Sequence, residues 1–523
     1  MPFGKKITQA FLRSSIYYSY LGHPKFERLY NILSYKRKGS SEKGLKILLN
    51  KQFDYGGQDI TVEDFKKLFK RCKNNESVWA FQINSFAWIR DLSEVGSNDA
   101  RICTRDLIKT WIKENSRWSD RNWGPAIIGK RFFFLLSFYD FYGRSADNEF
   151  KHILFTSMHK QERYLKKIIK REKSKGSYDY LQAVKGLIFA NIYFAKNKES
   201  LVHNLGLLKS SLNAQMLKEG CHNSRNIFVT FKILRSLLDV EYILKNSRTQ
   251  VPAFLTNYIH VLTKFIKSVI YKDGELPIFN GSFEYDAEKI LDVMHRIDFR
   301  VKTLHSFPVS GYEKIAAGKT NVLMSTATDN VDDRHFGVGS FEMQYDKKRM
   351  IVNCGAYMHE PKWKKALQET DAHSVLVINK EDNVASASKV VRRDNKQSTS
   401  VHIENNGYEK NCRAHMSRKI SVSADGKTII GTDIVKNTTS KDVVIRFHLH
   451  PEVSVSYTKN KKHLMLKIGK TSGWLFKTSE DNLSIEDSIY FGKGRFPQQT
   501  KQIVIREKAP KGENIISWLF EKL

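Results

Sequence analysis

A short polar segment, Gly220-Cys221-His222-Asn223-Ser224-Arg225-Asn226, stands immediately before an apolar stripe with helical spacing. The N-terminus of a helix favours an anion, because it carries unpaired N–H groups and the positive end of the helix dipole. His222, Asn223 and Arg225 would stand together there and could neutralise a carboxylate. The alternative is that Asn223 or Ser224 serves only as the helix N-cap. Both interpretations hold if one residue caps the helix and its neighbour points at a ligand.

A second candidate segment runs from Asp273 to Tyr285 and contains two glycines and a proline. Glycine and proline mark it as a loop, and its Phe, Asn and Tyr side chains could line a cleft. Asn280 is therefore a candidate for binding substrate. The phenol of Tyr285 could move a proton, provided that nearby positive charge lowers its pKa from about 10. An ordinary connection between elements is the alternative for this segment.

Two histidines stand at the starts of predicted strands. His335 is followed by Gly337 and Gly339 and leads into the first of these strands. A histidine beside flexible glycines can protrude into a cleft and titrate near neutral pH, so His335 is a candidate catalytic group. His373 precedes the apolar run from Val375 to Ile378. A place in the core is the default for His373, and substrate binding is the alternative.

Arg446, His448 and His450 share one face of another predicted strand, because side chains alternate along a strand. Arg446 is therefore a candidate for binding an anionic substrate. Two histidines at this spacing can bind a structural divalent metal if a third ligand joins them. Possible third ligands are His415, Asp433 and His463. A solvated or core-edge face is the favoured interpretation of the pair, so we expect no metal and no other cofactor.

Known motifs of cofactor and nucleic-acid sites do not occur in the sequence. A phosphate loop, a dinucleotide fingerprint, a nucleophile elbow and a His-Glu-x-x-His zinc motif are all absent. No recognisable nucleic-acid-binding module is present, so we expect no nucleic-acid partner. The five cysteines are scattered, and no two have Cys-x-x-Cys spacing. They are therefore predicted to be small buried hydrophobic residues.

The elements that must position these residues are of two kinds, and the first kind is helical. From residue 76 to residue 305 the apolar residues recur at helical spacing, which predicts about eight to ten helices. Two stripes illustrate it: Trp79, Ile83, Phe86 and Ala87, and then Ile227, Phe231, Leu234 and Leu238. Residues 1–75 are basic and irregular, and they are predicted to form an extended lead-in with some helix.

The apolar period changes after about Ser306. Alternation at Phe341, Met343 and Tyr345, a turn, and further alternation at Met350 and Val352 predict a hairpin. Similar alternation recurs at Val443, Ile445, Phe447 and Leu449 and at Leu464, Leu466 and Ile468. Residues 306–523 are therefore predicted to form an antiparallel β-sandwich. A helical domain followed by a β domain has its junction near residues 300–310, which is a natural place for a cleft.

The charge balance is strongly basic. The chain has 87 Lys and Arg residues against 55 Asp and Glu residues, a net charge of +32 that is spread along its length. Such a field favours an anionic partner, which could be nucleic acid, anionic lipid or an acidic polysaccharide, although biased codon usage would also produce it. Because 41% of the residues are apolar, the chain can bury a large core and is not a disordered polymer.

Targeting and membrane-spanning segments are not evident. The basic start lacks an apolar h-region, because Arg13 and the two serines after it interrupt the sequence. The longest aromatic run, from Phe132 to Tyr142, contains Ser137 and Asp140 and is too short to span a bilayer. We therefore expect a soluble, cytoplasmic protein, with the periplasm as the alternative compartment.

Taken in order, the motifs resemble those of the heparinase II/III-like polysaccharide lyases, especially the branch common in alphaproteobacteria. The resemblance covers the chain from about Trp79 to the C-terminus and rests on the order of the motifs and the change from helix to strand. The motifs are His222-Asn223-Ser224-Arg225-Asn226, Leu276-Pro277-Ile278-Phe279-Asn280-Gly281, His335-x-x-x-Gly339-Ser340-Phe341-Glu342, Asn353-Cys354-Gly355, Ala372-His373-Ser374, Asn406-Gly407-Tyr408 and Arg446-Phe447-His448-Leu449-His450.

This resemblance implies an incomplete (α/α) toroid joined to a C-terminal antiparallel β-sandwich. It also implies cleavage of a uronate-containing acidic polysaccharide by β-elimination. A carboxylate-neutralising group from the toroid would be Asn223 or His222, and an assisting histidine at the start of the β domain would be His335. Arg225, Asn280, His373 and Arg446 would bind the substrate.

The sequence departs from the family at the toroid tyrosine that serves as base or acid. Asp273 and Gly274 are followed by Glu275 and Leu276, where a tyrosine would be expected. The nearest substitutes are Tyr285 and Tyr408. The departure keeps open an alternative function, which is non-catalytic binding or assembly of an anionic envelope polysaccharide.

Overall fold

The computed structural model divides the chain into two compact units, which are described separately below. Unit 1 comprises Met1–Gln215 and Ser236–Asn257, and unit 2 comprises Met216–Arg235 and Tyr258–Leu523. The residues that the structure describes are 14, 29–33, 35, 38–73, 75, 77–116, 119, 122–171, 175–194, 197–328, 335–357, 360–469, 472–493 and 496–523.

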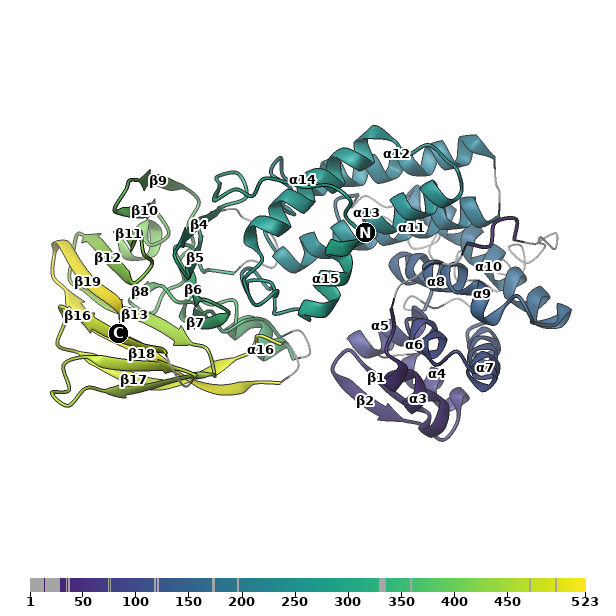
Figure 1. Ribbon diagram of the computed structural model, residues 1–523, viewed down its shortest axis with the longest axis horizontal. Coiled ribbons are helices and arrows are strands. Elements are labelled where there is room, and N and C mark those ends of the chain that lie inside the picture. The colour runs from purple at the N-terminus through teal and green to yellow at the C-terminus, as the bar shows by residue number, and fades with distance from the viewer. Residues whose placement is uncertain are drawn as a thin grey trace. The chain divides into compact units, whose positions relative to one another are not determined.

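Unit 1 is mainly helical (Figure 1), with the two-stranded hairpin β1–β2 between α3 and α4, whose bounds are given below. Two further helices, α13 (Ile227–Asn246) and α14 (Ala253–Val269), run through both units. The other elements of unit 1 are α3 (Ser41–Asn50), β1 (Gln52–Tyr55), β2 (Gln58–Thr61), α4 (Phe65–Cys72), α5 (Val78–Asn84), α6 (Trp88–Val95), α7 (Asn98–Glu114), α8 (Pro125–Ser137), α9 (Tyr139–Tyr142), α10 (Asn148–Ile169), α11 (Tyr178–Tyr193) and α12 (Lys198–Gln215).

Side-chain caps explain where many of these helices begin. An oxygen of the residue before the helix accepts a backbone N–H from the first turn, which satisfies a donor that has no partner inside the helix. The capping residues are Ser40, Asp64, Ser77, Ser97, Asp147 and Ser177.

One of the two predicted helical stripes is confirmed and the other is wrong as a single helix. Ile227 and the three stripe residues after it lie on α13 and are buried. In the first stripe, α5 ends at Asn84 and α6 begins at Trp88, because Phe86 between them adopts a left-handed conformation with φ of 64°. A left-handed residue cannot continue the hydrogen-bond ladder of a right-handed helix.

Unit 2 contains two antiparallel sheets. The eight-stranded sheet has the order β14-β15-β16-β19-β12-β11-β10-β9, and the nine-stranded sheet has the order β17-β18-β13-β7-β6-β5-β4-β3, with β8 paired to β13. The strands are β3 (Ser306–Phe307), β4 (Tyr312–Ala317), β5 (Thr320–Ser325), β6 (Phe341–Tyr345), β7 (Lys348–Val352), β8 (Leu376–Ile378), β9 (Ser388–Asp394), β10 (Ser398–Asn405), β11 (Ala414–Ser423), β12 (Thr428–Asn437), β13 (Lys441–Leu449), β14 (Val453–Tyr457), β15 (Leu464–Ile468), β16 (Ser472–Thr478), β17 (Leu483–Tyr490), β18 (Gln498–Ala509) and β19 (Gly512–Lys522).

Short helices complete this unit. They are α15 (Ala287–His295), α16 (Pro361–Ala366), the 3₁₀ turn η1 (Thr370–Ala372) and α17 (Glu409–Cys412).

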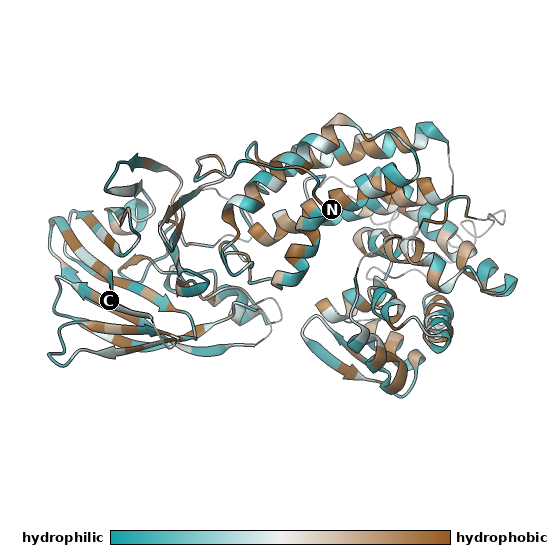
Figure 2. Cartoon of the chain, in the orientation of Figure 1, coloured by the Kyte–Doolittle hydropathy of each residue, from teal (hydrophilic) through white to brown (hydrophobic). Residues whose placement is uncertain are grey.

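The core of the β-sandwich lies between the two sheets. Phe341 of one sheet stacks on Trp518 of the other, with ring centroids 5.5 Å apart, and Phe447 meets the same indole at 4.9 Å. Hydrophobic and hydrophilic residues alternate along the strands (Figure 2), as expected when one face of each sheet is buried. The predicted hairpin is confirmed as β6–β7, and the predicted alternating strands are confirmed as β13 and β15.

The change from helix to strand occurs at β3, where the change of apolar period predicts it. The compact units divide the chain differently, because residues 216–235 and 258–305 group with the sheets of unit 2. The hairpin β1–β2 lies in a region whose sequence pattern indicates only a lead-in, and most of residues 1–37 lie outside the described residues.

All five cysteines are free and buried, as predicted. None of the helices that the structure describes combines the length and low charge needed to span a bilayer.

Candidate functional site

The loop before α13 is fixed in unit 2 by its own polar groups. The side-chain oxygen of Asn226 accepts the backbone N–H of Val229 at 2.9 Å and so caps α13. Arg225 has a φ of 56° and donates from its guanidinium to the carbonyl oxygen of Val309 at 2.6 Å. Its own carbonyl accepts the hydroxyl of Tyr312 at 2.5 Å. A left-handed backbone at a non-glycine residue is strained, and such strain is concentrated at functional sites.

His222 is buried in this loop as a neutral imidazole. Its Nδ1 lies 2.7 Å from the hydroxyl of Ser224 and 3.1 Å from the backbone nitrogen of the same residue. Burial, assisted by the positive charge of Lys232, lowers the pKa of His222 to about 4. Its Nε2 is buried and has no hydrogen-bond partner among the residues that the structure describes. His222 therefore offers one ring nitrogen to a ligand.

Asn223 lies in the turn between His222 and α13 and is half-buried. Its carboxamide makes no hydrogen bond to any described residue. The interpretation that Asn223 or Ser224 caps α13 is wrong, because the helix begins at Ile227 and Asn226 is its cap. The predicted role of Asn223 in the site stays a prediction.

A buried carboxylate holds the loop between α14 and α15. Glu342, on β6, accepts the hydroxyl of Tyr271 at 2.9 Å and the backbone N–H of Ile278 at 3.2 Å. Asn353 also donates to it, at 3.4 Å. Burial raises the pKa of Glu342 to about 7 despite the nearby Arg349 guanidinium. Strand β6 therefore holds the loop between α14 and α15 in place through the side chain of Glu342.

Arg349 of β7 also contacts the loop between α14 and α15. Its guanidinium donates to Asp273 at 2.9 Å and to the carbonyl oxygen of Leu276 at 3.0 Å, and it lies 3.4 Å from Glu284. Although burial alone would raise the pKa of Glu284, a hydrogen bond from His450 and the charge of Arg349 lower that pKa to about 2. The loop is thus anchored at its start, middle and end.

We expect Glu342→Leu to loosen this loop, because it leaves the buried donors of Tyr271, Ile278 and Asn353 without an acceptor. One buried unsatisfied group costs about 1–3 kcal/mol. Hydrogen–deuterium exchange should show faster exchange of the backbone amides between Ile278 and Tyr285. The matched variant Glu342→Gln keeps one acceptor oxygen and should retain most of the protection. Equal protection in the Leu variant would show that Glu342 does not hold the loop.

Gly281 is the point at which three segments of unit 2 meet. It follows Asn280, whose φ is 51° and whose side-chain amide donates to the Tyr312 hydroxyl at 3.0 Å. A Cβ placed on Gly281 would lie 3.2 Å from the Asn226 side-chain nitrogen and 3.3 Å from Nε2 of His335. The amide of Asn226 and the imidazole of His335 therefore both lie close to this glycine.

A buried ion pair holds the segments that carry the two histidines. The guanidinium of Arg418 pairs with Asp433 at 2.7 Å, and both side chains are fully buried. The same guanidinium donates to the carbonyl oxygens of Gly339 at 3.1 Å and Ser374 at 2.8 Å. One residue of β11 thus ties together the segments that follow His335 and His373.

His373 supports His335 from the core side. The two imidazole rings meet edge to face, with centroids 5.6 Å apart. Nδ1 of His373 lies 2.9 Å from the carbonyl oxygen of Glu369, and burial lowers the pKa of His373 to about 4. The core position that is the default for His373 is therefore the one observed, and its predicted role in substrate binding stays a prediction.

Tyr285 lies beside a cation, as a proton-transferring phenol requires. Its hydroxyl accepts a hydrogen bond from the guanidinium of Arg235 at 3.2 Å. Its ring packs on Phe228 and Phe231 of α13, with centroids 5.0 Å and 5.5 Å away. Lys289 lies 5.9 Å from the ring centroid. A neighbouring cation stabilises negative charge on a phenol oxygen. The position of Tyr285 beside Arg235 therefore suits a residue that exchanges a proton.

Tyr408 is not a suitable catalytic residue, which corrects the prediction from sequence. It is fully buried in the core of the β-sandwich, and its hydroxyl donates to the carbonyl oxygen of Leu376 at 3.0 Å. Burial raises the pKa of its phenol far above the ordinary value. No sugar can reach it there. Of the two tyrosines considered, Tyr285 is the one that remains.

Arg446 is already paired. Its guanidinium lies 2.8 Å from a carboxylate oxygen of Asp371, and Asp371 is half exposed. A substrate anion would have to compete with this carboxylate, so the assignment of Arg446 to substrate binding stays a prediction.

The two histidines considered as metal ligands, His448 and His450, contact other protein atoms. Nδ1 of His448 lies 2.8 Å from the Ser488 hydroxyl, and its Nε2 lies 2.9 Å from the carbonyl oxygen of Asp371. His450 lies past the end of β13, and its Nε2 is 3.6 Å from Glu284. Both nitrogens of His448 are thus engaged by protein atoms. Within the described residues no cluster of His, Cys, Asp and Glu has the arrangement of a metal site.

Acid should destabilise the protein partly through His448. Burial lowers the pKa of His448 to about 3, so below about pH 6.5 the unfolded chain takes up a proton that the folded protein does not. His448→Gln lacks this group. We expect wild type to lose stability relative to the variant as pH falls from 6.5 to 4, with a slope that approaches about 1.4 kcal/mol per pH unit. Urea unfolding of both proteins at several pH values measures this difference, and a difference independent of pH would contradict it.

The residue that the sequence analysis missed is Asn226. It appears in the motif before α13, but its role as cap and its contact with Gly281 depend on where the helix begins. The available signal was its position directly before the apolar stripe, which is where a cap belongs. Arg235 was also missed, and it lies two turns further along the same face of α13 as Phe228.

Solved structures of polysaccharide lyases share this fold. The chain is similar to the heparan sulfate lyase HepC from Pedobacter heparinus, with a TM-score of 0.64 and 14% identity over 98% of this chain and 88% of that chain. It is also similar to a crystal structure of heparinase III, with a TM-score of 0.75 and 12% identity over 99% and 91% of the two chains. These likenesses confirm the predicted fold class, a helical toroid followed by an antiparallel β-sandwich.

Residues 300–519 match the family described as heparinase II/III-like, C-terminal. This part of the chain is therefore similar to the heparinase II/III-like family, as the order of the sequence motifs predicts. A relative over most of the chain is FtsZ-localized protein C from Caulobacter vibrioides, which is 23% identical over 480 residues, covering 85% of this chain and 82% of the relative.

Proposed function

We propose that the protein is a polysaccharide lyase that cleaves a uronate-containing acidic polysaccharide by β-elimination. The observation that carries this proposal is the meeting of the Asn226 amide and the His335 imidazole at Gly281. An amide donor and an imidazole base beside the same glycine suit a substrate that carries a carboxylate next to an acidic C–H group.

The chemistry depends on offsetting the charge of the uronate carboxylate. The C5 proton is too weakly acidic to leave unless negative charge is stabilised as an enolate-like state develops. The Asn226 amide is the donor we assign to this task, with Asn223 and Nε2 of His222 as further donors or contacts beside it. One donor placed where charge develops contributes roughly 3–4 kcal/mol to lowering the barrier.

Proton transfer is assigned to His335 and Tyr285. One removes the C5 proton and the other protonates the leaving glycosidic oxygen, and each step of this kind contributes about 10² to 10⁴-fold. Hydrolysis would instead need two carboxyl groups facing each other across the bond. The groups gathered at Gly281 are amide and imidazole, which favours elimination.

The positive charge of the protein suits a polyanionic chain. Besides the net charge of +32, the face of α13 next to Tyr285 carries Lys232 and Arg235, and Lys289 lies close by. Positive potential raises the local concentration of a polyanion and its rate of association. Arg225 is less suited to direct binding, because its guanidinium already donates to the Val309 carbonyl oxygen.

Binding of an anionic envelope polysaccharide without turnover is the second candidate function. Two observations favour it: the chain has Glu275 and Leu276 where the family has a tyrosine, and the Caulobacter relative is named for its localisation with FtsZ rather than for a reaction. The absence of a nucleic-acid partner and the cytoplasmic or periplasmic compartment stay predictions.

Ultraviolet absorbance separates the two functions. β-Elimination creates a carbon–carbon double bond conjugated with the carboxylate, and this product absorbs where the substrate does not. Purified protein should be incubated with heparan sulfate, alginate, hyaluronan and bacterial exopolysaccharides. A rise in absorbance with at least one of them supports the lyase. Saturable binding without any rise would establish the second function and exclude the first for those polymers.

A further inference from the structure

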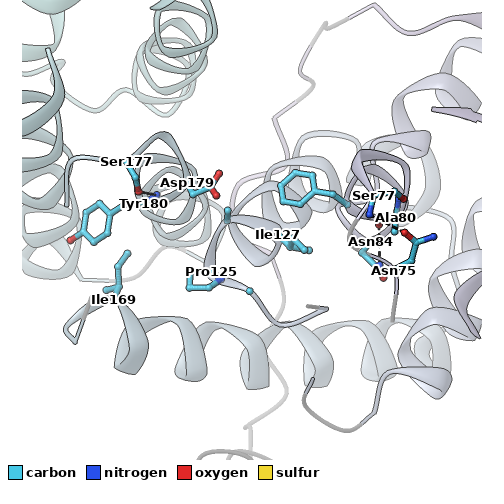
Figure 3. A pocket seen from close by; sticks show the side chains of 13 residues that line it. Asn75, Ser77, Ala80, Asn84, Pro125, Ile127, Ile169, Ser177, Asp179 and Tyr180 are labelled. Atoms are coloured by element: carbon cyan, nitrogen blue, oxygen red, sulfur yellow. Dashed lines mark hydrogen bonds between the residues drawn. The ribbon is translucent and has the colours of Figure 1, made fainter. Parts of the chain in front are cut away.

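Unit 1 contains a cavity that the proposed site does not use. Its volume is about 420 Å³, within the range of about 300–1,000 Å³ that is usual for small-molecule sites. It is bordered by α5 and the residues just before it, by the starts of α8 and α11, and by the last residue of α10. Figure 3 shows residues of α11 on one side, α8 in the middle and the start of α5 on the other: Ser177, Asp179 and Tyr180, then Pro125 and Ile127, then Asn75 and Ser77.

Close packing of two parallel helices places their N-terminal ends side by side at this cavity. A Cβ on Gly129 of α8 would lie 2.1 Å from the carbonyl oxygen of Gln182 of α11, and one on Gly186 would lie 2.4 Å from Gly129. Further along the same two helices the rings of Phe133 and Phe189 meet at 5.2 Å. A side chain at either glycine would clash, so glycine at both positions is what lets the starts of the two helices lie this close together.

Polar groups without protein partners line the cavity. Helix α8 starts at Gly124-Pro125 with no side-chain cap, and the buried backbone N–H groups of Ala126 and Ile127 have no acceptor among the described residues. The side-chain oxygen of Asn75 accepts the N–H of Ser77 at 2.9 Å, which leaves its amide group free to donate. The carboxylate of Asp179 forms no hydrogen bond or ion pair with any described residue.

Apolar and aromatic groups form the rest of the lining. Phe81 and the buried Tyr180 provide rings, and Ile127 and Ile169 provide aliphatic surface. Lys130, which does not line the cavity, lies 4.4 Å from the Phe81 ring centroid. The lining therefore combines hydrogen-bond donors, one acceptor carboxylate and apolar surface, and it holds no cationic side chain.

We propose that this cavity binds one uncharged sugar ring, a hexose or an N-acetylhexosamine. Sugar hydroxyls can donate to the Asp179 carboxylate and accept from the Asn75 amide and the α8 N–H groups, while the C–H face of the ring packs on Phe81 and Tyr180. An anionic ring is disfavoured, because the full charge of the Asp179 carboxylate would repel it and already offsets the partial positive charge at the start of α11, while the lining holds no cationic side chain. This inference goes beyond the proposed function and does not depend on turnover.

Titration calorimetry of the full chain with N-acetylglucosamine, glucose and glucuronate tests the proposal. We expect one of the two neutral sugars to bind at least about tenfold more tightly than glucuronate. Asp179→Ala should weaken that binding at least about tenfold, because the acceptor of two hydroxyls is lost. The matched control is Asp99→Ala, since Asp99 is also an exposed acidic residue in the first turn of a helix, α7, and it does not line the cavity.

Three results would overturn the proposal. They are the absence of binding by both neutral sugars, binding of glucuronate as tight as that of the neutral sugars, and an Asp179→Ala variant that binds like wild type. A protein without any ultraviolet product signal can still meet every expectation here. Failure of the lyase proposal and failure of the sugar cavity are therefore distinguishable.

Discussion

Asn226→Asp is expected to lower kcat/KM on a cleaved polysaccharide by roughly 10² to 10³-fold, which is the effect of losing one donor to developing charge. The aspartate keeps an oxygen that can accept the Val229 N–H, so the cap of α13 and the stability of the fold should remain. What it removes is the amide donor next to Gly281, and it adds a charge that repels the uronate. Initial rates from ultraviolet absorbance measure the change in kcat/KM, and thermal melting of the wild type and the variant measures whether stability is unchanged.

The comparison with Asn223→Ala decides which asparagine neutralises the carboxylate. Asn223 has no structural partner among the described residues, so its removal should leave the melting temperature unchanged. A small kinetic effect for Asn223→Ala beside a large one for Asn226→Asp supports our assignment, and the reverse order would transfer the role to Asn223. His335→Ala should lower kcat/KM by about 10² to 10⁴-fold if the imidazole moves a proton.

Arg418→Met is expected to destabilise the protein by about 3–5 kcal/mol, as does breaking a buried ion pair from one side. The change leaves the Asp433 carboxylate buried without its cation. It also removes the donors to the carbonyl oxygens of Gly339 and Ser374, so the segments that carry His335 and His373 lose their common tie. Urea unfolding followed by circular dichroism measures the loss.

Lys436→Ala is the matched control for this ion pair. Lys436 lies on the neighbouring strand and pairs with Glu513 at 2.9 Å, but the two side chains are 64% and 48% exposed. An exposed pair of this kind contributes less than about 1 kcal/mol. Equal losses in the two variants would mean that burial does not set the strength of the Arg418–Asp433 pair.

Local periodicity explains what could be predicted. The change of apolar spacing after Ser306 is visible within a few residues on either side, and it correctly separates helices from strands. The hairpin β6–β7 and the strand β13 were predictable for the same reason, because alternation is a property of the strand itself. His335 and the segment before α13 could be proposed as functional from residue type and position alone.

Contacts between segments far apart in the chain decided what could not be predicted: the burial of the two tyrosines and the start of α13. Tyr408 and Tyr285 both have polar neighbours in the sequence. Tyr408 is nevertheless buried between the two sheets, whereas Tyr285 lies beside Arg235. The start of α13, and with it the choice between Asn223 and Asn226 as cap, depends on the packing of the loop against Val309 and Tyr312.

The sequence by itself determined the order of elements, the buried faces of the strands and the segments that carry polar groups. Only the tertiary structure decided that Asn226, Gly281 and His335 meet. Glu342 and Arg349 hold the loop between α14 and α15 in place, and Arg418 holds the segments that follow His335 and His373. All three are buried charged side chains whose hydrogen-bond partners are far away in the chain. Periodicity reports which face of an element is buried, but it carries no information about which distant partner a buried charge will find.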